Sequence, residues 1–248
     1  MAATKLYVLP GSHPCAAVEA AFELKGLPFE RVWLLPLAQL VVGPLRYGGI
    51  TVPGLRMGGE RIVGSRAIMR KLDRIQPEPP LLPAPDDPRY AQVLEAERWG
   101  DEVLQPAPRR ILDVGFVRKP HAMESYIGDA KLPLPRPLMG PAMPITAKLM
   151  AIRNEAKDDS ARADIAALPG QLDQVDRWIA EGLLGGERPN AADLQIGSTI
   201  RLLLTIADLR PVIEGRPAAS LVRYFPPSVG EIPAGTLPAQ WIPAPVAA

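Results

Sequence analysis

The sequence predicts two domains of different class, an α/β domain over residues 1–77 and an all-helical domain over residues 89–248. In the first, short apolar runs with strand and helix spacing alternate. In the second, apolar residues recur at helical spacing. Between them, residues 78–88 are so rich in proline that regular structure is excluded, so we expect a linker there.

The first domain is predicted to have the order β-α-β-α-β-β-α. A helix is expected where an apolar stripe follows Pro14, because proline suits a first helical turn and Gly26 closes the stripe. The segment 37–45, bracketed by prolines, is expected to form at most one short, distorted helix. The other expected elements are strands at 5–9 and 30–35, a hairpin turning at Gly58-Gly59, and a helix from Ser65 to about Ile75.

The hairpin begins at a proline and is followed by a helix that opens on a serine. Pro53 stands where a strand begins and its missing N–H costs no ladder bond. If the Val52-Pro53 bond is cis, the amide and carbonyl of Val52 stay free for a ligand. The helix that opens at Ser65 offers unpaired N–H groups, a positive dipole end and a hydroxyl to an anion.

This run, Val52-Pro53-x-Leu55, a hairpin, then Ser65-Arg66-Ala67-Ile68, resembles the second half of the thioredoxin-like domain of glutathione transferases. The resemblance implies that the first domain binds glutathione: Val52 through its backbone to the cysteinyl part, Ser65 to the γ-glutamyl carboxylate. Most members of the family have an acidic residue where this chain has Gly64, so another low-molecular-weight thiol is an alternative ligand. The residues expected to bind glutathione are His13, Thr51, Val52, Pro53, Gly64, Ser65 and Arg66.

The same resemblance places the residue that activates the thiol after the first strand, in the loop Pro10-Gly11-Ser12-His13-Pro14-Cys15. Counting back from Lys25-Gly26, the serine or cysteine of the family's Ser/Cys-loop branch falls on Ser12. A hydroxyl donor at a helix N-terminus favours the thiolate, and lowering a thiol pKa by about two units takes roughly 2.7 kcal/mol. We therefore expect Ser12 to be the catalytic residue.

Three neighbouring side chains are alternatives to Ser12. His13 would take the activating position if the alignment shifted by one residue, although an exposed loop histidine is the simpler expectation. Cys15 would serve a redox function if it formed a mixed disulfide with glutathione, but a small residue at this place in a helix is usually packed. Tyr7, in the first strand, is expected to be a packed aromatic.

The second domain contains one strong local signal. Asn190 and Asp193 have the spacing of a capping box, and a strongly apolar segment follows, so we expect a buried core helix with these two residues in structural roles. Glutathione transferases carry such a box in their second domain. The stretch 116–144, rich in proline and glycine, is expected to be a long excursion, and the proline-rich tail to fold back over the cleft.

Composition excludes several classes of function. Lys+Arg 28 against Asp+Glu 27 gives a net charge of +1, which argues against nucleic acid or an anionic membrane surface as partner. No apolar run approaches the roughly 18 residues of a membrane helix, and no signal peptide is recognised, so a cytoplasmic protein is expected. One cysteine excludes an internal disulfide, and with only one cysteine and two histidines that lie far apart in the sequence, no metal site is suggested.

Together these observations predict a bacterial-type glutathione transferase that conjugates glutathione, as co-substrate, to an apolar electrophile, as in detoxification. The resemblance also implies a homodimer. Two other functions remain open at this point: a glutathione-dependent thiol-disulfide reductase that uses Cys15, and a non-enzymatic binding protein that has kept the fold.

Overall fold

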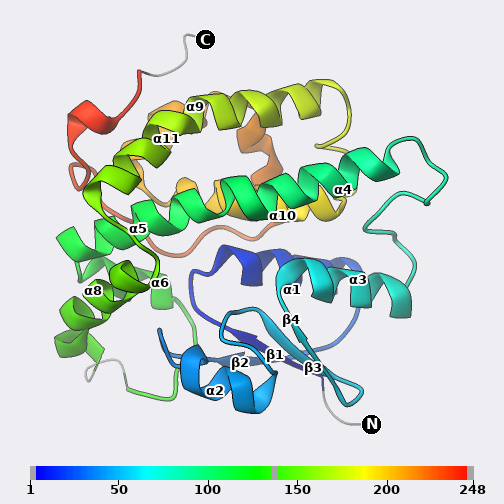
Figure 1. Ribbon diagram of the computed structural model, residues 1–248, viewed down its shortest axis with the longest axis horizontal. Helices are drawn as coiled ribbons and strands as arrows, with labels where there is room; N and C mark the ends of the chain where they lie inside the picture. The colour runs from blue at the N-terminus through cyan, green and yellow to red at the C-terminus, as the bar shows by residue number, and fades with distance from the viewer. Residues whose placement is uncertain (1–3, 136–138, 245–248) are drawn as a thin grey trace.

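A computed structural model gives the structure of the protein and describes residues 4–135 and 139–244. Two layers are visible, a helical layer and a layer built on one β-sheet (Figure 1). Helices α1 (His13–Leu24) and α3 (Ser65–Ile75) lie between the sheet and the helical layer. Helix α2 (Gln39–Arg46) lies on the opposite side of the sheet. The expected pairing of an α/β domain with an all-helical one is therefore confirmed.

The sheet has four strands in the order β2-β1-β3-β4. Strand β1 (Lys5–Val8) pairs in parallel with β2 (Glu30–Trp33) and antiparallel with β3 (Gly54–Met57). Strands β3 and β4 (Glu60–Val63) form the expected hairpin, and its turn residues Gly58 and Gly59 have φ of 56° and 87°. Those angles explain the two glycines, because side chains with a Cβ disfavour positive φ. The predicted order β-α-β-α-β-β-α is confirmed.

The segment expected to link the domains has no helix or strand and is held in place. Lys25 has a fully buried side chain, and its Nζ pairs with Asp73 and donates to the carbonyl oxygens of Gln76 and Pro79. Leu81 is fully buried in the core of the sheet layer. The segment is therefore pinned to the sheet layer. Its assignment as a domain boundary stays a prediction.

Two prolines of the helical layer stand in different surroundings. A π-helical turn lies just before Pro106, whereas Pro169 lies inside a continuous helix. The stretch 116–144 contains a helix of its own, and its residues 136–138 lie outside the described part. The elements are α4 (Tyr90–Trp99), the π-turn η1 (Gly100–Leu104), α5 (Pro106–Arg118), α6 (Ala122–Ile127), η2 (Gly140–Ala142), α8 (Met143–Arg153), α9 (Asp158–Ala180), α10 (Ala191–Leu203), η3 (Ala207–Leu209), α11 (Arg210–Ile213), η4 (Pro217–Tyr224) and η5 (Ala239–Trp241).

Helix α10 joins the two layers. Its N-terminus has the expected capping box: Asn190 Oδ1 accepts from the amides of Ala192 and Asp193, and Asp193 Oδ2 accepts from the amide of Asn190. Along the helix, Leu194 packs in the core of the sheet layer, whereas Ile196 and Ile200 pack in the helical core. One helix therefore contributes to both cores and connects the two layers.

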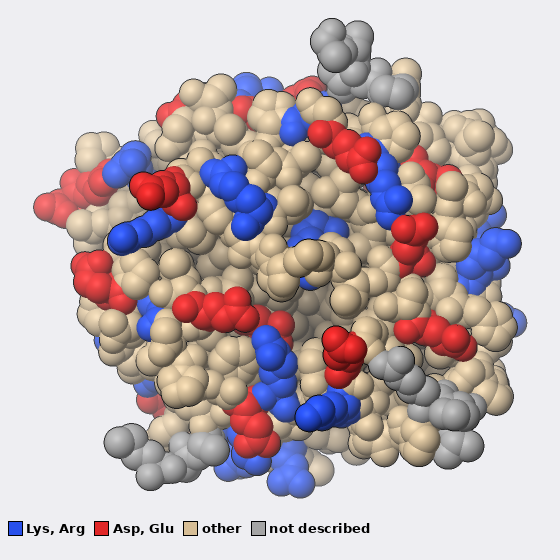
Figure 2. All heavy atoms as spheres, turned by 180° about the vertical axis from the view of Figure 1, so that it is seen from behind, with Lys and Arg blue, Asp and Glu red and all other residues tan. Residues whose placement is uncertain are grey.

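The surface carries charges of both signs. Figure 2 shows basic and acidic side chains interspersed over one face, with no large area of a single sign on that face. Across residues 4–135 and 139–244, no helix combines the length and apolarity needed to cross a membrane.

Candidate functional site

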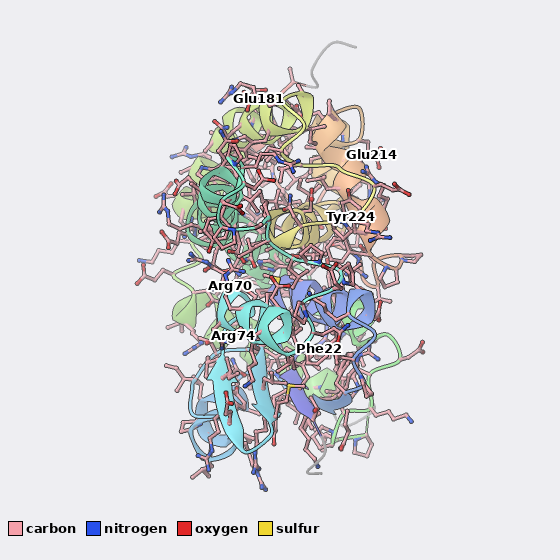
Figure 3. All side chains as sticks on the ribbon, turned by 90° about the vertical axis from the view of Figure 1, so that its right-hand side faces the viewer. Phe22, Arg70, Arg74, Glu181, Glu214 and Tyr224 are labelled. Atoms are coloured by element: carbon pink, nitrogen blue, oxygen red, sulfur yellow. The ribbon has the colours of Figure 1, made fainter. Side chains whose placement is uncertain are left out.

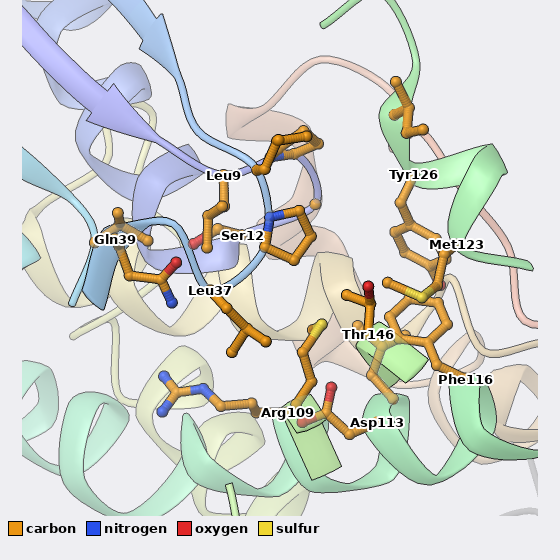
Figure 4. A pocket seen from close by; sticks show the side chains of 18 of the residues that line it. Leu9, Ser12, Leu37, Gln39, Arg109, Asp113, Phe116, Met123, Tyr126 and Thr146 are labelled. Atoms are coloured by element: carbon orange, nitrogen blue, oxygen red, sulfur yellow. The ribbon is translucent and has the colours of Figure 1, made fainter. Parts of the chain in front are cut away.

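A cavity of about 330 Å³ opens between the N-terminus of α1 and helices α5, α6 and α8 of the helical layer (Figure 4). Of the residues expected to act on glutathione, it brings together Ser12, His13, Thr51 and Val52. The opposite wall is mainly apolar. Its side chains are Leu112, Phe116, Met123, Tyr126, Ile127, Leu132, Leu134, Met139, Met143, Met150 and Leu202.

Ser12 is the N-cap of α1 and faces this cavity. Its backbone is extended, with φ −75° and ψ 114°, and its side chain caps none of the helix amides. The first-turn N–H groups and the hydroxyl are therefore donors at a positive helix end. This combination stabilises an anion such as a thiolate.

His13 and Cys15 are both buried in the first turn of α1. Burial, with a further contribution from Arg109, holds the pKa of His13 well below its usual range, so this side chain is neutral at pH 7. Its Nε2 has no partner among the described residues, and His13 lines the cavity rather than projecting into solvent. Burial raises the pKa of Cys15 to about 12, despite a hydrogen bond from Ser12, so the thiol stays protonated. Reactivity requires the thiolate, so this environment does not favour a redox role.

Thr51 and Val52 border the cavity from the loop before β3. The Val52-Pro53 peptide bond is cis. Pro53 is buried, and its carbonyl accepts from the amide of Gly64 at 2.9 Å, which ties this loop to the start of α3. Neither the amide nor the carbonyl of Val52 has a hydrogen bond within residues 4–135 and 139–244. Both are therefore available to a ligand.

Gly64, Ser65 and Arg66, also expected to bind glutathione, do not line this cavity. The hydroxyl of Ser65 is buried and donates to Gln195 Oε1 at 2.8 Å. Arg66 lies 3.3 Å from a carboxylate oxygen of Glu102. Arg70, labelled in Figure 3, pairs with the fully buried Glu97. We call this group the interdomain network; its members are Ser65, Arg66, Arg70, Glu97, Asp101, Glu102 and Gln195.

The loop that carries Ser12 is in contact with α6, a helix within the stretch 116–144. Gly11 has φ of 71°, and a Cβ built there would lie 2.9 Å from Cδ1 of Tyr126 on α6. The Tyr126 hydroxyl is in turn hydrogen-bonded to Thr205 Oγ1 at 2.7 Å. The aromatic ring therefore fits over a residue with no side chain, which brings α6 against the loop beside Ser12 (Figure 4).

Charged side chains also enter the cavity wall. Arg109 and Asp113, one turn apart on α5, both line it, and Arg153 lies at its rim. Asp113 is 1% exposed; its Oδ2 accepts from Asn154 Nδ2 at 2.7 Å, and burial raises its pKa to about 6. Burial also lowers the pKa of Arg109, although guanidinium groups stay protonated in proteins.

The comparisons with known proteins agree with this geometry. The family described as glutathione S-transferase, N-terminal domain, matches residues 6–80. The N-terminal domain of this chain belongs to the glutathione S-transferase family. A search of curated proteins found no match.

Solved structures extend the likeness to the helical layer. A glutathione S-transferase from Rhodospirillum rubrum F11 is 19% identical, with a TM-score of 0.56 over 89% of this chain and 86% of that one. Glutathione transferase F7 from Populus trichocarpa is 19% identical, with a TM-score of 0.55 over 90% and 88%. Maleylacetoacetate isomerase from Anaeromyxobacter dehalogenans 2CP-1, with bound GSH, is 22% identical, with a TM-score of 0.51 over 80% and 79%. The protein therefore has the two-domain glutathione S-transferase fold.

Within this glutathione S-transferase fold, sequence reasoning did not find Gln39, Arg109, Asp113, Tyr126 or Arg153 as cavity residues. The i, i+4 spacing of Arg109 and Asp113 was visible, but nothing local shows which face of α5 meets a cavity. Tyr126 lies in a proline-rich stretch, where the sequence did not indicate a helix. The described residues contain no group of three or more His, Cys, Asp or Glu that could hold a metal ion.

Proposed function

We propose that the protein binds glutathione and holds its sulfur as a thiolate beside Ser12, for attack on an electrophile in the apolar part of the cavity. The observation that carries this proposal is the cavity itself. It places a hydroxyl that caps no helix amide at a helix N-terminus, and free backbone groups of Val52, opposite a wall of apolar side chains. The shared fold of the Anaeromyxobacter dehalogenans protein, whose structure contains GSH in its active site, supports glutathione as the thiol.

In the proposed reaction, the α1 N-terminus, the Ser12 hydroxyl and the apolar wall have separate roles. The α1 N-terminus and the Ser12 hydroxyl donate to the sulfur, so its proton is lost more readily to solvent. The sulfur then forms a bond to the electrophilic carbon, and a leaving group departs with its bonding electrons. The apolar wall excludes water around the reacting atoms and favours the apolar part of the electrophile.

Ser65 is retained in this proposal with a condition. A γ-glutamyl carboxylate at the start of α3 requires the Ser65 hydroxyl to exchange its bond to Gln195 for one to the ligand. The helix amides there are available without any exchange. Thr51, Pro53, Gly64 and Arg66 remain proposed as neighbours of the glutathione backbone, and His13 as a neutral cavity residue.

The test is titration calorimetry with glutathione, followed by a mass-spectrometric assay for conjugates on an electrophile panel. Wild-type protein should bind glutathione and form conjugates, and Ser12→Ala should bind it and form far less. Thiol-disulfide exchange that is abolished by Cys15→Ser would support the reductase instead. Binding without turnover of any electrophile would support a non-enzymatic protein, and no binding at millimolar concentration would reject glutathione itself.

Assembly and location remain predictions. The family resemblance implies a homodimer, and light scattering that gives the mass of a single chain would reject this. A cytoplasmic location is likewise expected, and fractionation of expressing cells would check it.

A further inference from the structure

The cavity wall contains a cation that forms no direct ion pair among the described residues, although Asp113 and Asp101 act on its charge from a longer distance. Arg109 is half-buried and forms no ion pair among the described residues; its one side-chain hydrogen bond there is a 3.5 Å contact to Gln105 Oε1. The acid nearest to it along α5, Asp113, is hydrogen-bonded to Asn154 instead. Removing a guanidinium from water without a paired anion is unfavourable, so this position is suited to an anionic ligand group.

A second cation increases the positive charge at the same end. Arg153 lines the cavity from the end of α8, and its Nη2 donates to the carbonyl of Ile50 at 3.2 Å rather than to a carboxylate. Burial lowers the pKa of Arg109 and Arg153 adds to this effect, whereas Asp113 and Asp101 oppose it. An anion between the two arginines would relieve their repulsion and gain charge-assisted hydrogen bonds.

These cations share their wall with apolar side chains. Leu112 and Phe116 project from the same helix as Arg109, and Met143 and Met150 from the same helix as Arg153. In Figure 4 the guanidinium of Arg109 lies toward Leu37 and Gln39, while Phe116 and Met123 lie at the other end. The cavity is thus cationic at one end and apolar at the other.

We propose that the second substrate is an apolar molecule with a carboxylate group, which is held between Arg109 and Arg153 while its apolar body lies against α5, α6 and α8. This inference rests on the proposed function for its turnover measurements, because it names the substrate class of that same site. Arg109 is then a residue that determines specificity, selecting anionic electrophiles over neutral ones of the same shape.

The test uses a matched pair of electrophiles, chloronitrobenzoate and the corresponding chloronitrobenzamide, with glutathione. Both lose chloride when sulfur bonds to the ring carbon, and each rate is divided by the uncatalysed rate with glutathione, because the amide activates the ring more strongly than the carboxylate. Wild-type protein should prefer the acid, and Arg109→Gln should reduce that preference in kcat/KM by about 10- to 100-fold. Arg109→Lys should keep part of it. Arg118→Gln, on the same helix but paired with Asp158 outside the cavity, should leave the preference unchanged.

Three results would overturn the inference: no preference for the acid in wild type, equal loss for acid and amide in Arg109→Gln, or weaker glutathione binding in that variant. The last two would show that Arg109 serves the thiol. If neither the wild-type protein nor any variant turns over either compound, the proposed function fails. A binding measurement then tests the anion site by itself. Fluorescence titration without glutathione would then compare anilinonaphthalene sulfonate with neutral N-phenylnaphthylamine. Selectivity for the anion that Arg109→Gln removes would uphold the anion site, and its absence would reject it.

Discussion

Two regions of the interface between the layers use polar residues in opposite ways. In the cavity, the backbone groups of Val52 have no hydrogen-bond partner among the described residues, and no carboxylate forms an ion pair with Arg109 there. In the interdomain network, Ser65 on α3 donates a hydrogen bond to Gln195 on α10. Glu97 on α4 pairs with Arg70 on α3. We propose that the cavity receives the ligand, whereas the network links α3 to the helical layer. Variants of Ser12, Val52 or Arg109 should change function, and variants in the network should change stability.

The largest effect is expected from Glu97→Gln. Glu97 is fully buried, and the substitution leaves Arg70 and Arg66 without their shared carboxylate. Breaking a buried pair by removing one partner costs about 3–5 kcal/mol, so the free energy of unfolding should fall by about that amount. Urea denaturation measures it. A loss below about 1 kcal/mol would show that the network does not hold the layers.

Asp113, in the cavity, provides the contrasting buried acid. Burial raises its folded-state pKa to about 6 from 3.8, so the folded protein binds its proton more tightly than the unfolded chain. Its contribution to stability is therefore lost as pH rises from about 4 to about 6, by roughly 3 kcal/mol. Asp113→Asn keeps an acceptor for Asn154 and should gain stability relative to wild type across that window. Asp193 titrates in the same range, so the difference between the two proteins is the quantity to measure.

Ser12→Ala should impair thiol activation while leaving stability unchanged. With the pKa of bound glutathione about two units higher, kcat/KM at neutral pH should fall about 100-fold. The deficit should shrink as pH rises, since the thiol then ionises without help. Stopped-flow or steady-state rates across pH, with calorimetric binding as the control, measure this. A deficit that stays constant with pH would mean that Ser12 positions the thiol rather than ionising it.

Ser65→Ala tests whether the network and the glutathione site overlap. The change leaves Gln195 Oε1 buried without its donor and should cost about 1–2 kcal/mol of stability. Gln195→Ala is the matched control because it removes the other partner and frees the Ser65 hydroxyl. Calorimetry with glutathione should show weaker binding for Ser65→Ala alone. Equal affinity in both variants would assign Ser65 to the network only.

The smallest effect is expected at an exposed pair away from both regions. Arg162 and Asp159 lie on α9 at i, i+3 spacing with 61% and 92% of their side chains exposed. Surface pairs of this kind contribute about 0–1 kcal/mol, so Arg162→Ala should shift the urea midpoint little. A larger loss would mean that single substitutions cannot separate the network from ordinary surface pairs.

The difference between the two regions also explains how much of the structure could be predicted from the sequence. The helix after Pro14, the glycine turn of the hairpin and the Asn190 capping box depend on neighbours within a few residues, so local patterns predicted them. Ser65 was assigned from a local motif, but its hydroxyl partner lies 130 residues away in sequence, where no pattern indicates contact. The cavity wall was hidden for the same reason. Its residues become neighbours only when α5, α6 and α8 pack over the sheet layer.

The contact between Gly11 and Tyr126 has a consequence for protein engineering. One side of the cavity comes from the domain that the family match covers, and the other from a segment well beyond it. A designer could in principle exchange residues 116–157 to change the substrate while keeping the thiol chemistry. Such a graft must supply a flat ring that fits over Gly11, because a mismatch there would move the loop that carries Ser12. The two halves are therefore interchangeable only if this contact is preserved, together with the one from Arg153 to the carbonyl of Ile50.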